Sequence, residues 1–278
     1  GSMALSLVHE QDPDVITLDL EMPRMDGFTF LRILGKTRAI PVIVVTSDAR
    51  PESALLALEL GARDFVVKPA RTADVRQLKT QLLARVRLLA GLRRRIPPTW
   101  SPPPEVAFPS DTRLVVIGCS TGGPRALRDI LTRLRPPLRA PILIAQHMPP
   151  RFTEAFADRL AKATGLDVAE GKDGEPLPPG AVRIAPGGRH MVVRRNAGGK
   201  AEVGINAQPP ECGLRPAAER VDQRLRRVEG DDASLIDDRD AVAQSLGFFH
   251  IYRARAQIAF FVRGSRILWY DFTHDHPT

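Results

Sequence analysis

The sequence predicts an α/β protein with two parallel-sheet regions separated by a proline-rich segment. In both regions, short apolar runs rich in β-branched residues alternate with segments of helical spacing, as expected for strands buried on both faces of a parallel sheet. Between the regions, residues 97–104 contain five prolines, which breaks regular structure and is typical of a stiff linker. The chain of 278 residues is long enough for two ordinary domains.

The first region, residues 4–70, has three expected strands and two expected helices. The strands are Asp14–Leu20, Ile40–Thr46 and Asp64–Lys68, and the helices are residues 27–34 and 51–60. Pro51 in the first turn and Gly61 just past the end are typical boundaries for the second helix. A long amphipathic helix is expected over residues 72–95, with apolar residues at Leu78, Leu82, Val86 and Leu89.

The second region begins near Thr112 and alternates in the same way. Strands are expected at 114–119 and 141–145, and helices at 124–134 and 151–163. A hairpin is expected over residues 182–193, with Pro186-Gly-Gly188 as its turn. After about Ala218 the character changes, with a basic run at 220–227, an acidic run at 231–240 and a possible hairpin around Arg263–Arg266.

Composition narrows the function classes. The chain is 43% hydrophobic and 26% charged, as in a water-soluble globular protein, and no apolar run approaches the roughly 20 residues of a membrane span. Gly1-Ser2-Met3 resembles a tag remnant, and no secretory signal is visible, so the cytoplasm is expected. Two cysteines are too few for a disulfide framework. The net charge of +8 lacks a zinc, RNA-binding or helix-turn-helix motif beside it, which disfavours nucleic acid as the main partner.

Two strand ends of the second region carry groups suited to nucleophilic catalysis. Residues 118–122 fit G-x-S-x-G, the pattern that presents a serine on a sharp turn from strand to helix. His147 ends the next expected strand. Because catalytic groups gather at the carboxyl ends of parallel strands, Ser120 is expected as the nucleophile and His147 as its base. The alternative for the glycine-rich turn is structural packing or a phosphate site, although no Gly-Lys-Ser/Thr ending follows it.

Three strand ends of the first region carry Asp19, Thr46 and Lys68. A carboxylate, a hydroxyl and an ammonium at one sheet edge suit an aspartyl phosphate, whose oxygens the other two groups would bind. With the Met22-Pro23 and Lys68-Pro69 dipeptides, the pattern resembles the second half of a response-regulator receiver domain, which has a flavodoxin-like fold.

The resemblance to receivers implies that Asp19 is the phosphoacceptor, Thr46 the switch hydroxyl and Lys68 the phosphoryl-binding lysine. Receivers begin with a strand that bears a magnesium-binding acidic pair, and nothing before Leu5 supplies it. The region is therefore expected to be an N-terminally truncated receiver that is poorly phosphorylated and folds poorly alone.

The second region resembles the doubly wound, parallel-sheet catalytic domain of CheB-type protein-glutamate methylesterases. The motifs are 117–124 (IGCSTGGP), 144–149 (IAQHMP) and 184–191 (IAPGGRHM). The resemblance implies hydrolysis of glutamate methyl esters on methyl-accepting chemotaxis receptors, with possible deamidation of glutamine. It also implies regulation by a chemotaxis histidine kinase. It gives Ser120 and His147 their catalytic roles and Thr121 a role in stabilising the oxyanion. Hydrolysis would need no cofactor or metal, and magnesium would serve only receiver phosphorylation.

This resemblance also suggests a division of the chain. The expected parts are a partial receiver domain (1–71), a helical and proline-rich linker (72–111), a methylesterase catalytic domain (112–218) and an atypical C-terminal segment (219–278).

The third catalytic group is not found by its motif. The family places the acid that orients the histidine in a Thr-Gly-Met-Gly-x-Asp-Gly loop, which is absent here. Asp237, Asp238 and Asp240 lie at roughly the right distance along the chain, and Asp240 is the best of these weak candidates. Two alternatives therefore stay open: a catalytically inactive module that docks on receptors or kinases, and a basic adaptor for nucleic acid.

Overall fold

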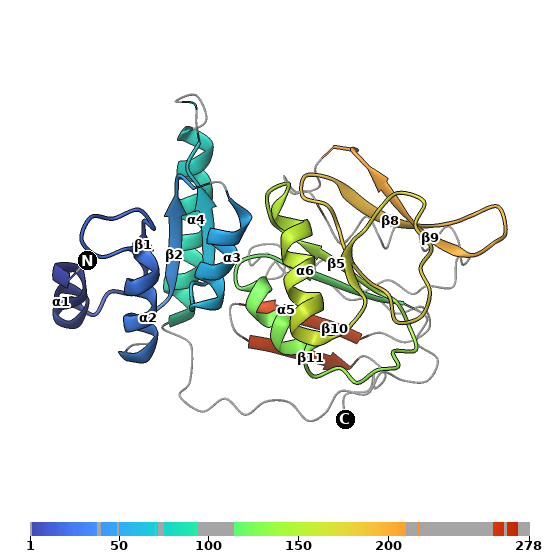
Figure 1. Ribbon diagram of the computed structural model, residues 1–278, viewed down its shortest axis with the longest axis horizontal. Coiled ribbons are helices and arrows are strands. Elements are labelled where there is room, and N and C mark those ends of the chain that lie inside the picture. The colour runs from blue at the N-terminus through green and yellow to red at the C-terminus, as the bar shows by residue number, and fades with distance from the viewer. Residues whose placement is uncertain are drawn as a thin grey trace, which may run out of the picture. The chain divides into compact units, whose positions relative to one another are not determined.

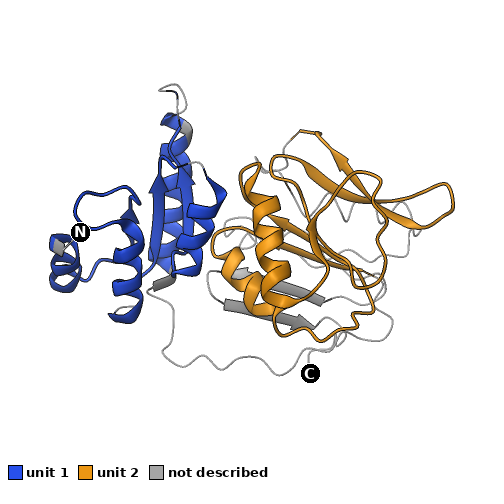
Figure 2. Ribbon diagram, viewed as in Figure 1, with its two compact units in different colours: residues 1–102 blue, residues 103–278 orange. Residues whose placement is uncertain are grey.

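The computed structural model describes residues 2–37, 40–48, 50–69, 71, 75–93, 114–209 and 216, together with the backbone of 258–263 and 266–271. The chain forms two compact units, which are residues 1–102 (unit 1) and residues 103–278 (unit 2) (Figure 2). The basic run at 220–227 and the acidic run at 231–240 lie outside the described residues.

Unit 1 contains a parallel three-stranded sheet of order β1-β2-β3. Its strands are β1 (Ile16–Leu18), β2 (Val42–Thr46) and β3 (Asp64–Val67). Its helices are α1 (Ser2–Gln11), α2 (Gly27–Thr37), α3 (Pro51–Glu59) and α4 (Val75–Arg93). Apart from α1, every element lies where the sequence predicts it. The predicted boundary of α3 is confirmed, since Pro51 opens the helix and Gly61 follows it with a φ of +111°.

Helix α4 packs against the sheet of unit 1 through its apolar positions (Figure 1). Leu89 is almost fully buried against Ile43 and Val66, and Leu78, Leu82, Val86 and Leu88 pack partly buried beside them. The spacing of these residues places them on one face of the helix, which explains why the sequence pattern located the helix correctly.

Helix α1 was not predicted. Among its described side chains, Val8 alone belongs to the buried core, while Met3 and Leu7 are exposed. A segment with so little buried apolar surface has no stripe for a sequence pattern to reveal.

Unit 2 contains a parallel four-stranded sheet of order β4-β5-β7-β6. Its strands are β4 (Val115–Cys119), β5 (Ile142–Gln146), β6 (Val168–Glu170) and β7 (Val182–Ile184). Helix α5 (Gly123–Leu131) connects β4 to β5, and α6 (Phe152–Thr164) connects β5 to β6; the two helices lie side by side (Figure 1). The two parallel sheets with their connecting helices confirm the predicted α/β class.

The predicted hairpin over residues 182–193 is wrong. Strand β7 lies between β5 and β6 in the parallel sheet, and all three of its residues are buried there. After the Pro186-Gly-Gly188 turn the chain enters β8 (His190–Arg195), which pairs antiparallel with β9 (Ala201–Asn206). Val182 and Ile184 are fully buried, and the buried Arg183 between them is paired with Asp167 and Glu175, which suits an interior strand. The true hairpin turn is the later one, where the Asn196 N–H donates to the Lys200 carbonyl (2.9 Å).

The β8–β9 hairpin packs on the sheet of unit 2. Met191, Val193 and Val203 from the hairpin share one buried cluster with Val116 and Leu143 from the sheet. Because side chains alternate along a strand, these sheet residues point to one face of β4 and β5.

Two further strands, β10 (Ile258–Arg263) and β11 (Arg266–Asp271), pair antiparallel and confirm the hairpin predicted around Arg263–Arg266.

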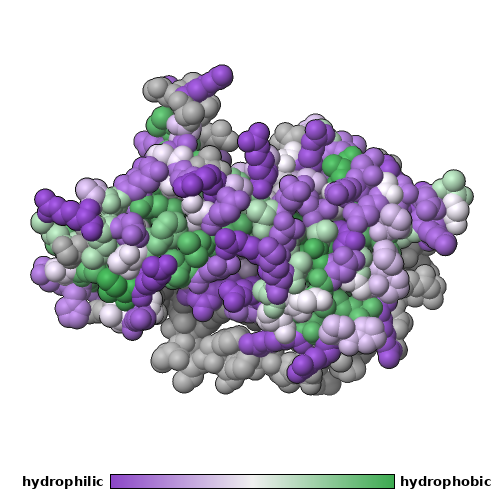
Figure 3. Space-filling model, viewed as in Figure 1, coloured by the Kyte–Doolittle hydropathy of each residue, from purple (hydrophilic) through white to green (hydrophobic). Residues whose placement is uncertain are grey.

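The described surface of unit 2 is charged along α5, where Arg125, Arg128 and Asp129 are exposed, and hydrophilic side chains are spread over the face seen in Figure 3. Within the described part of the chain, no helix is long and apolar enough to cross a membrane.

Candidate active site and receiver site

Ser120 and His147 follow two strands that pair directly with each other. Cys119, the last residue of β4, is in register with Gln146, the last residue of β5. The His147 N–H donates a 2.9 Å hydrogen bond to the Cys119 carbonyl, which closes the ladder at this last residue pair. Ser120 and His147 therefore occupy neighbouring positions at one sheet edge, where adjacent backbones are about 4.8 Å apart.

The turn after Ser120 has the tight geometry that its glycines predict. The Gly123 N–H donates a 2.8 Å hydrogen bond to the Ser120 carbonyl, and Gly122 has a φ of +81°, which strains any residue with a Cβ. Helix α5 starts at Gly123, directly after this turn. The chain thus passes from strand to helix within three residues and leaves Ser120 half-buried at the bend.

Three neighbours of this pair have distinct environments. Thr121 is buried, whereas His147 is half-buried and so partly open to solvent. Cys119 is fully buried, and desolvation strongly raises the pKa of its thiol. Cys119 is therefore a packed side chain without nucleophilic character at neutral pH.

His190 begins β8 and is fully buried, with its Nε2 3.2 Å from the carbonyl oxygen of Pro209. This burial favours a structural role for His190 over contact with a substrate.

Glu170 is a carboxylate at the same sheet edge. Glu170 ends β6, but β7 separates β6 from β5, so its backbone lies two strands, or about 10 Å, from that of His147. Its carboxylate accepts a hydrogen bond from the hydroxyl of Thr153. The candidate orienting acids Asp237, Asp238 and Asp240 lie outside the described residues.

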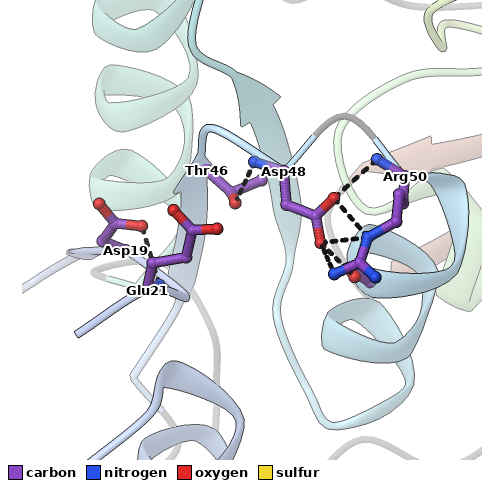
Figure 4. Close-up of polar contacts among 6 residues, drawn as sticks. Asp19, Glu21, Thr46, Asp48 and Arg50 are labelled. Atoms are coloured by element: carbon purple, nitrogen blue, oxygen red, sulfur yellow. Dashed lines mark hydrogen bonds and ion pairs between the residues drawn. The ribbon is translucent and has the colours of Figure 1, made fainter. Parts of the chain in front are cut away.

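In unit 1, Asp19 and Lys68 form an ion pair at the carboxyl edge of the sheet. Asp19 also accepts a 3.1 Å hydrogen bond from the main-chain N–H of Glu21 (Figure 4). Partial burial acts to raise the pKa of Asp19, but the hydrogen bonds from Lys68 and Glu21, with the charge of Lys68, lower it overall. Asp19 is therefore an ionised carboxylate at neutral pH.

Thr46 ends β2 at the same edge and is fully buried. Its hydroxyl accepts a 3.0 Å hydrogen bond from the Asp48 N–H (Figure 4). Its carbonyl accepts a 2.8 Å hydrogen bond from the Lys68 N–H. Asp48 is held in turn by Arg50 and Ser53, and these hydrogen bonds bring the pKa of its carboxyl far below the usual range. Hydrogen bonds thus link Thr46 to Asp48, and Asp48 to Arg50 and Ser53.

The structure therefore places Ser120 and His147 after the ends of neighbouring strands, and it places Asp19, Thr46 and Lys68 at the carboxyl edge of the other sheet. In the part of the chain that the structure describes, no group of three or more His, Cys, Asp or Glu side chains is arranged to hold a metal ion. The described residues alone do not make up a magnesium site beside Asp19.

The sequence pattern did not predict a role at the site for Gln146, whose side-chain Nε2 bonds to the carbonyls of Ser120 and His147. The one sign of it in the sequence is that a polar residue ends an apolar strand.

Comparison with known proteins identifies two family models along the chain. The model described as CheB methylesterase matches residues 115–235, and the response regulator receiver domain matches residues 1–79. These matches overlie the two sheets described above.

Curated relatives match over most of the chain. The protein-glutamate methylesterase/protein-glutamine glutaminase 2 of Pseudomonas aeruginosa is 41% identical over 236 residues, which cover 82% of this chain and 67% of the relative. The protein-glutamate methylesterase/protein-glutamine glutaminase 6 of Anaeromyxobacter dehalogenans is 37% identical over 253 residues, which cover 87% of this chain and 72% of the relative. Among solved structures, the CheB methylesterase catalytic domain of Thermotoga maritima is 33% identical, with a TM-score of 0.41 over 50% of this chain and 75% of that one.

Proposed function

Because the chain belongs to the CheB-type protein-glutamate methylesterase family, we propose that it hydrolyses glutamate methyl esters on chemoreceptors and deamidates glutamine side chains there. The observation that carries this proposal is the placement of Ser120 and His147 at paired ends of β4 and β5. A hydroxyl and an imidazole at such positions are suited to acyl transfer. The relatives are named as enzymes, which does not support the alternative of an inactive docking module.

In the proposed reaction, the Ser120 Oγ attacks the ester carbonyl while the His147 imidazole takes its proton. The main-chain N–H of Thr121, the residue after the nucleophile, donates to the oxyanion that develops. When the intermediate collapses, the C–O bond to the methoxy group breaks and His147 returns the proton, so methanol leaves. Water, activated by His147, then cleaves the Ser120 ester and releases the glutamate carboxylate. A glutamine side chain follows the same steps and releases ammonia.

A carboxylate is expected to orient the second ring nitrogen of His147, and Asp240 stays the candidate for this role.

Unit 1 supports a regulatory role in this proposal. Asp19 is proposed as the site that a chemotaxis histidine kinase phosphorylates, inefficiently as expected from the sequence, with Lys68 and Thr46 binding the phosphoryl oxygens. The Lys68–Asp19 ion pair supports it, because the ammonium already lies against the carboxylate that would carry the phosphoryl group. Receiver phosphorylation uses magnesium, and hydrolysis by Ser120 and His147 needs no cofactor. The expected setting is the cytoplasm, where receptor signalling helices lie.

The test is methanol release from methylated receptor membranes by the wild-type protein, Ser120→Ala and Ser6→Ala. Ser6 is exposed on α1, so Ser6→Ala makes the same chemical change away from the site. We expect Ser120→Ala to lose release by about three orders of magnitude or more, while Ser6→Ala keeps it. Full release by Ser120→Ala, or none by a wild-type protein with a cooperative melt, would contradict the proposal.

A further inference from the structure

We propose that Gln146 is a positioning residue that holds the proposed nucleophile and base in register. This inference rests on the function proposed for Ser120 and His147. Gln146 is the last residue of β5, and only 2% of it is exposed, so it cannot meet a substrate directly. Its role has to act through its neighbours.

The side-chain amide of Gln146 bonds to the main chain of both proposed catalytic residues. Its Nε2 lies 3.1 Å from the carbonyl oxygen of Ser120 and 3.1 Å from that of His147. A carbonyl oxygen only accepts hydrogen bonds, so both partners require the NH2 group and its two hydrogens. One side chain thus links the turn that carries the nucleophile to the strand end that carries the base.

The other end of this amide indicates that the glutamine is not there for stability alone. Among the described residues, Gln146 Oε1 is buried without a hydrogen-bond partner. A buried oxygen without a partner carries a cost that a methionine side chain of similar length would avoid. The gain that offsets this cost is the pair of bonds made by Nε2.

Gly123 leaves the space in which this amide lies. A Cβ at position 123 would fall on Gln146 Oε1 and would also come within 2.8 Å of the Cys119 Cβ. Gly123 further donates its N–H to the Ser120 carbonyl, which therefore accepts bonds from both Gly123 and Gln146. The turn after Ser120 and the end of β5 are thus both hydrogen-bonded to the Ser120 carbonyl oxygen.

The bond from Gln146 to the Ser120 carbonyl limits small displacements of the Ser120 turn relative to His147. The His147 N–H fixes β5 to the Cys119 carbonyl, and Gln146 fixes the next carbonyl, that of Ser120. Without the second bond the Ser120 turn is free to move relative to His147. A displacement of about 1 Å at a reacting group can cost about 100-fold in rate.

The experiment compares Gln146→Met with Leu131→Ala in the full chain. Leu131 ends α5, eight residues or about 12 Å along the helix from Gly123, and it is fully buried, so Leu131→Ala lowers stability away from the Ser120 turn. Three quantities are measured: kcat and KM for methanol release, the rate at which a fluorophosphonate ester modifies Ser120, and the melting temperature. Gly123→Ala serves as a second variant that displaces the Gln146 amide without removing it.

We expect Gln146→Met and Gly123→Ala to lower kcat and the phosphonylation rate together by about 10- to 100-fold, with KM little changed. Leu131→Ala should melt at a lower temperature and keep both rates. Wild-type kcat in a folded Gln146→Met, or an equal loss of rate in Leu131→Ala, would overturn the positioning role alone. Absence of Ser120-dependent turnover and phosphonylation in the wild-type protein would instead overturn the proposed function, and this role with it.

Discussion

The main-chain N–H of His147 donates a 2.9 Å hydrogen bond to the carbonyl oxygen of Cys119, the residue before Ser120. This bond belongs to the last residue pair of the parallel ladder of β4 and β5, Cys119 and Gln146. The sheet therefore fixes the backbone up to Cys119 and His147, and the Gln146 side chain bonds to the next carbonyl, that of Ser120. Groups held on rigid strands keep their geometry better than groups held on loops.

The burial of Cys119, the residue before Ser120, predicts that its thiol is unreactive in the folded protein. Full burial strongly raises the pKa of the Cys119 thiol, so almost no thiolate forms at pH 8. We expect iodoacetamide to leave Cys119 unmodified in the folded protein and to modify it in urea, measured by mass spectrometry of the peptide that contains it. Rapid labelling of Cys119 in the folded protein would contradict this environment.

The Lys68–Asp19 pair predicts a pH response of unit 1. Lys68→Met removes both the hydrogen bond and the charge that oppose the effect of burial, so the pKa of Asp19 should rise. A carboxyl whose pKa is lowered by folding stabilises the fold above its usual value of 3.8, and this stabilisation is lost as the pH falls through the lowered value. Carboxyl NMR titration measures the shift. Lys36→Met, an exposed change on α2, should leave the pKa of Asp19 unaltered.

The sequence could predict these sites because the chemistry lies at the ends of strongly patterned strands. Ser120 and His147 follow runs of five buried residues each, and such runs are easily found from hydrophobicity alone. Strand β6 was missed because its three residues are too few for a pattern, and without it β7 looked like half of a hairpin. The role proposed for Gln146 depends on bonds to two backbone carbonyls. Every residue has such a carbonyl, so the sequence does not indicate which ones a side chain will contact.

Thr153 predicts a stability effect close to the site. Its side chain is fully buried, and its hydroxyl donates to the Glu170 carboxylate and accepts a 3.0 Å hydrogen bond from the Gly187 N–H. Thr153→Val keeps the shape but leaves both partners unsatisfied, so we expect a loss of about 1–3 kcal/mol in the free energy of unfolding. Urea denaturation measures it. Thr153→Ser retains the hydroxyl and should recover most of the loss; an equally large loss in Thr153→Ser would show that packing of the methyl group dominates.

Gly187 predicts how tightly the loop after His147 is held. A Cβ at position 187 would lie 2.6 Å from backbone atoms of Pro149 and Pro150 and 2.7 Å from the Met148 carbonyl oxygen. Because backbone atoms cannot turn aside as a side chain can, Gly187→Ala should push this loop outward and cost about 1–3 kcal/mol in the free energy of unfolding.

The matched control for this change is Gly198→Ala in the β8–β9 turn. The nearest atom to a Cβ there is the Asn196 Oδ1 at 3.4 Å, which is the end of a side chain, so a change within about 0.5 kcal/mol is expected. Urea denaturation compares the two variants, and methanol release reports whether the loop after His147 has moved. Equal stabilities for Gly187→Ala and Gly198→Ala would show that the backbone of residues 148–150 moves aside at little energetic cost. The close approach would then play no part in holding the loop that follows the proposed base.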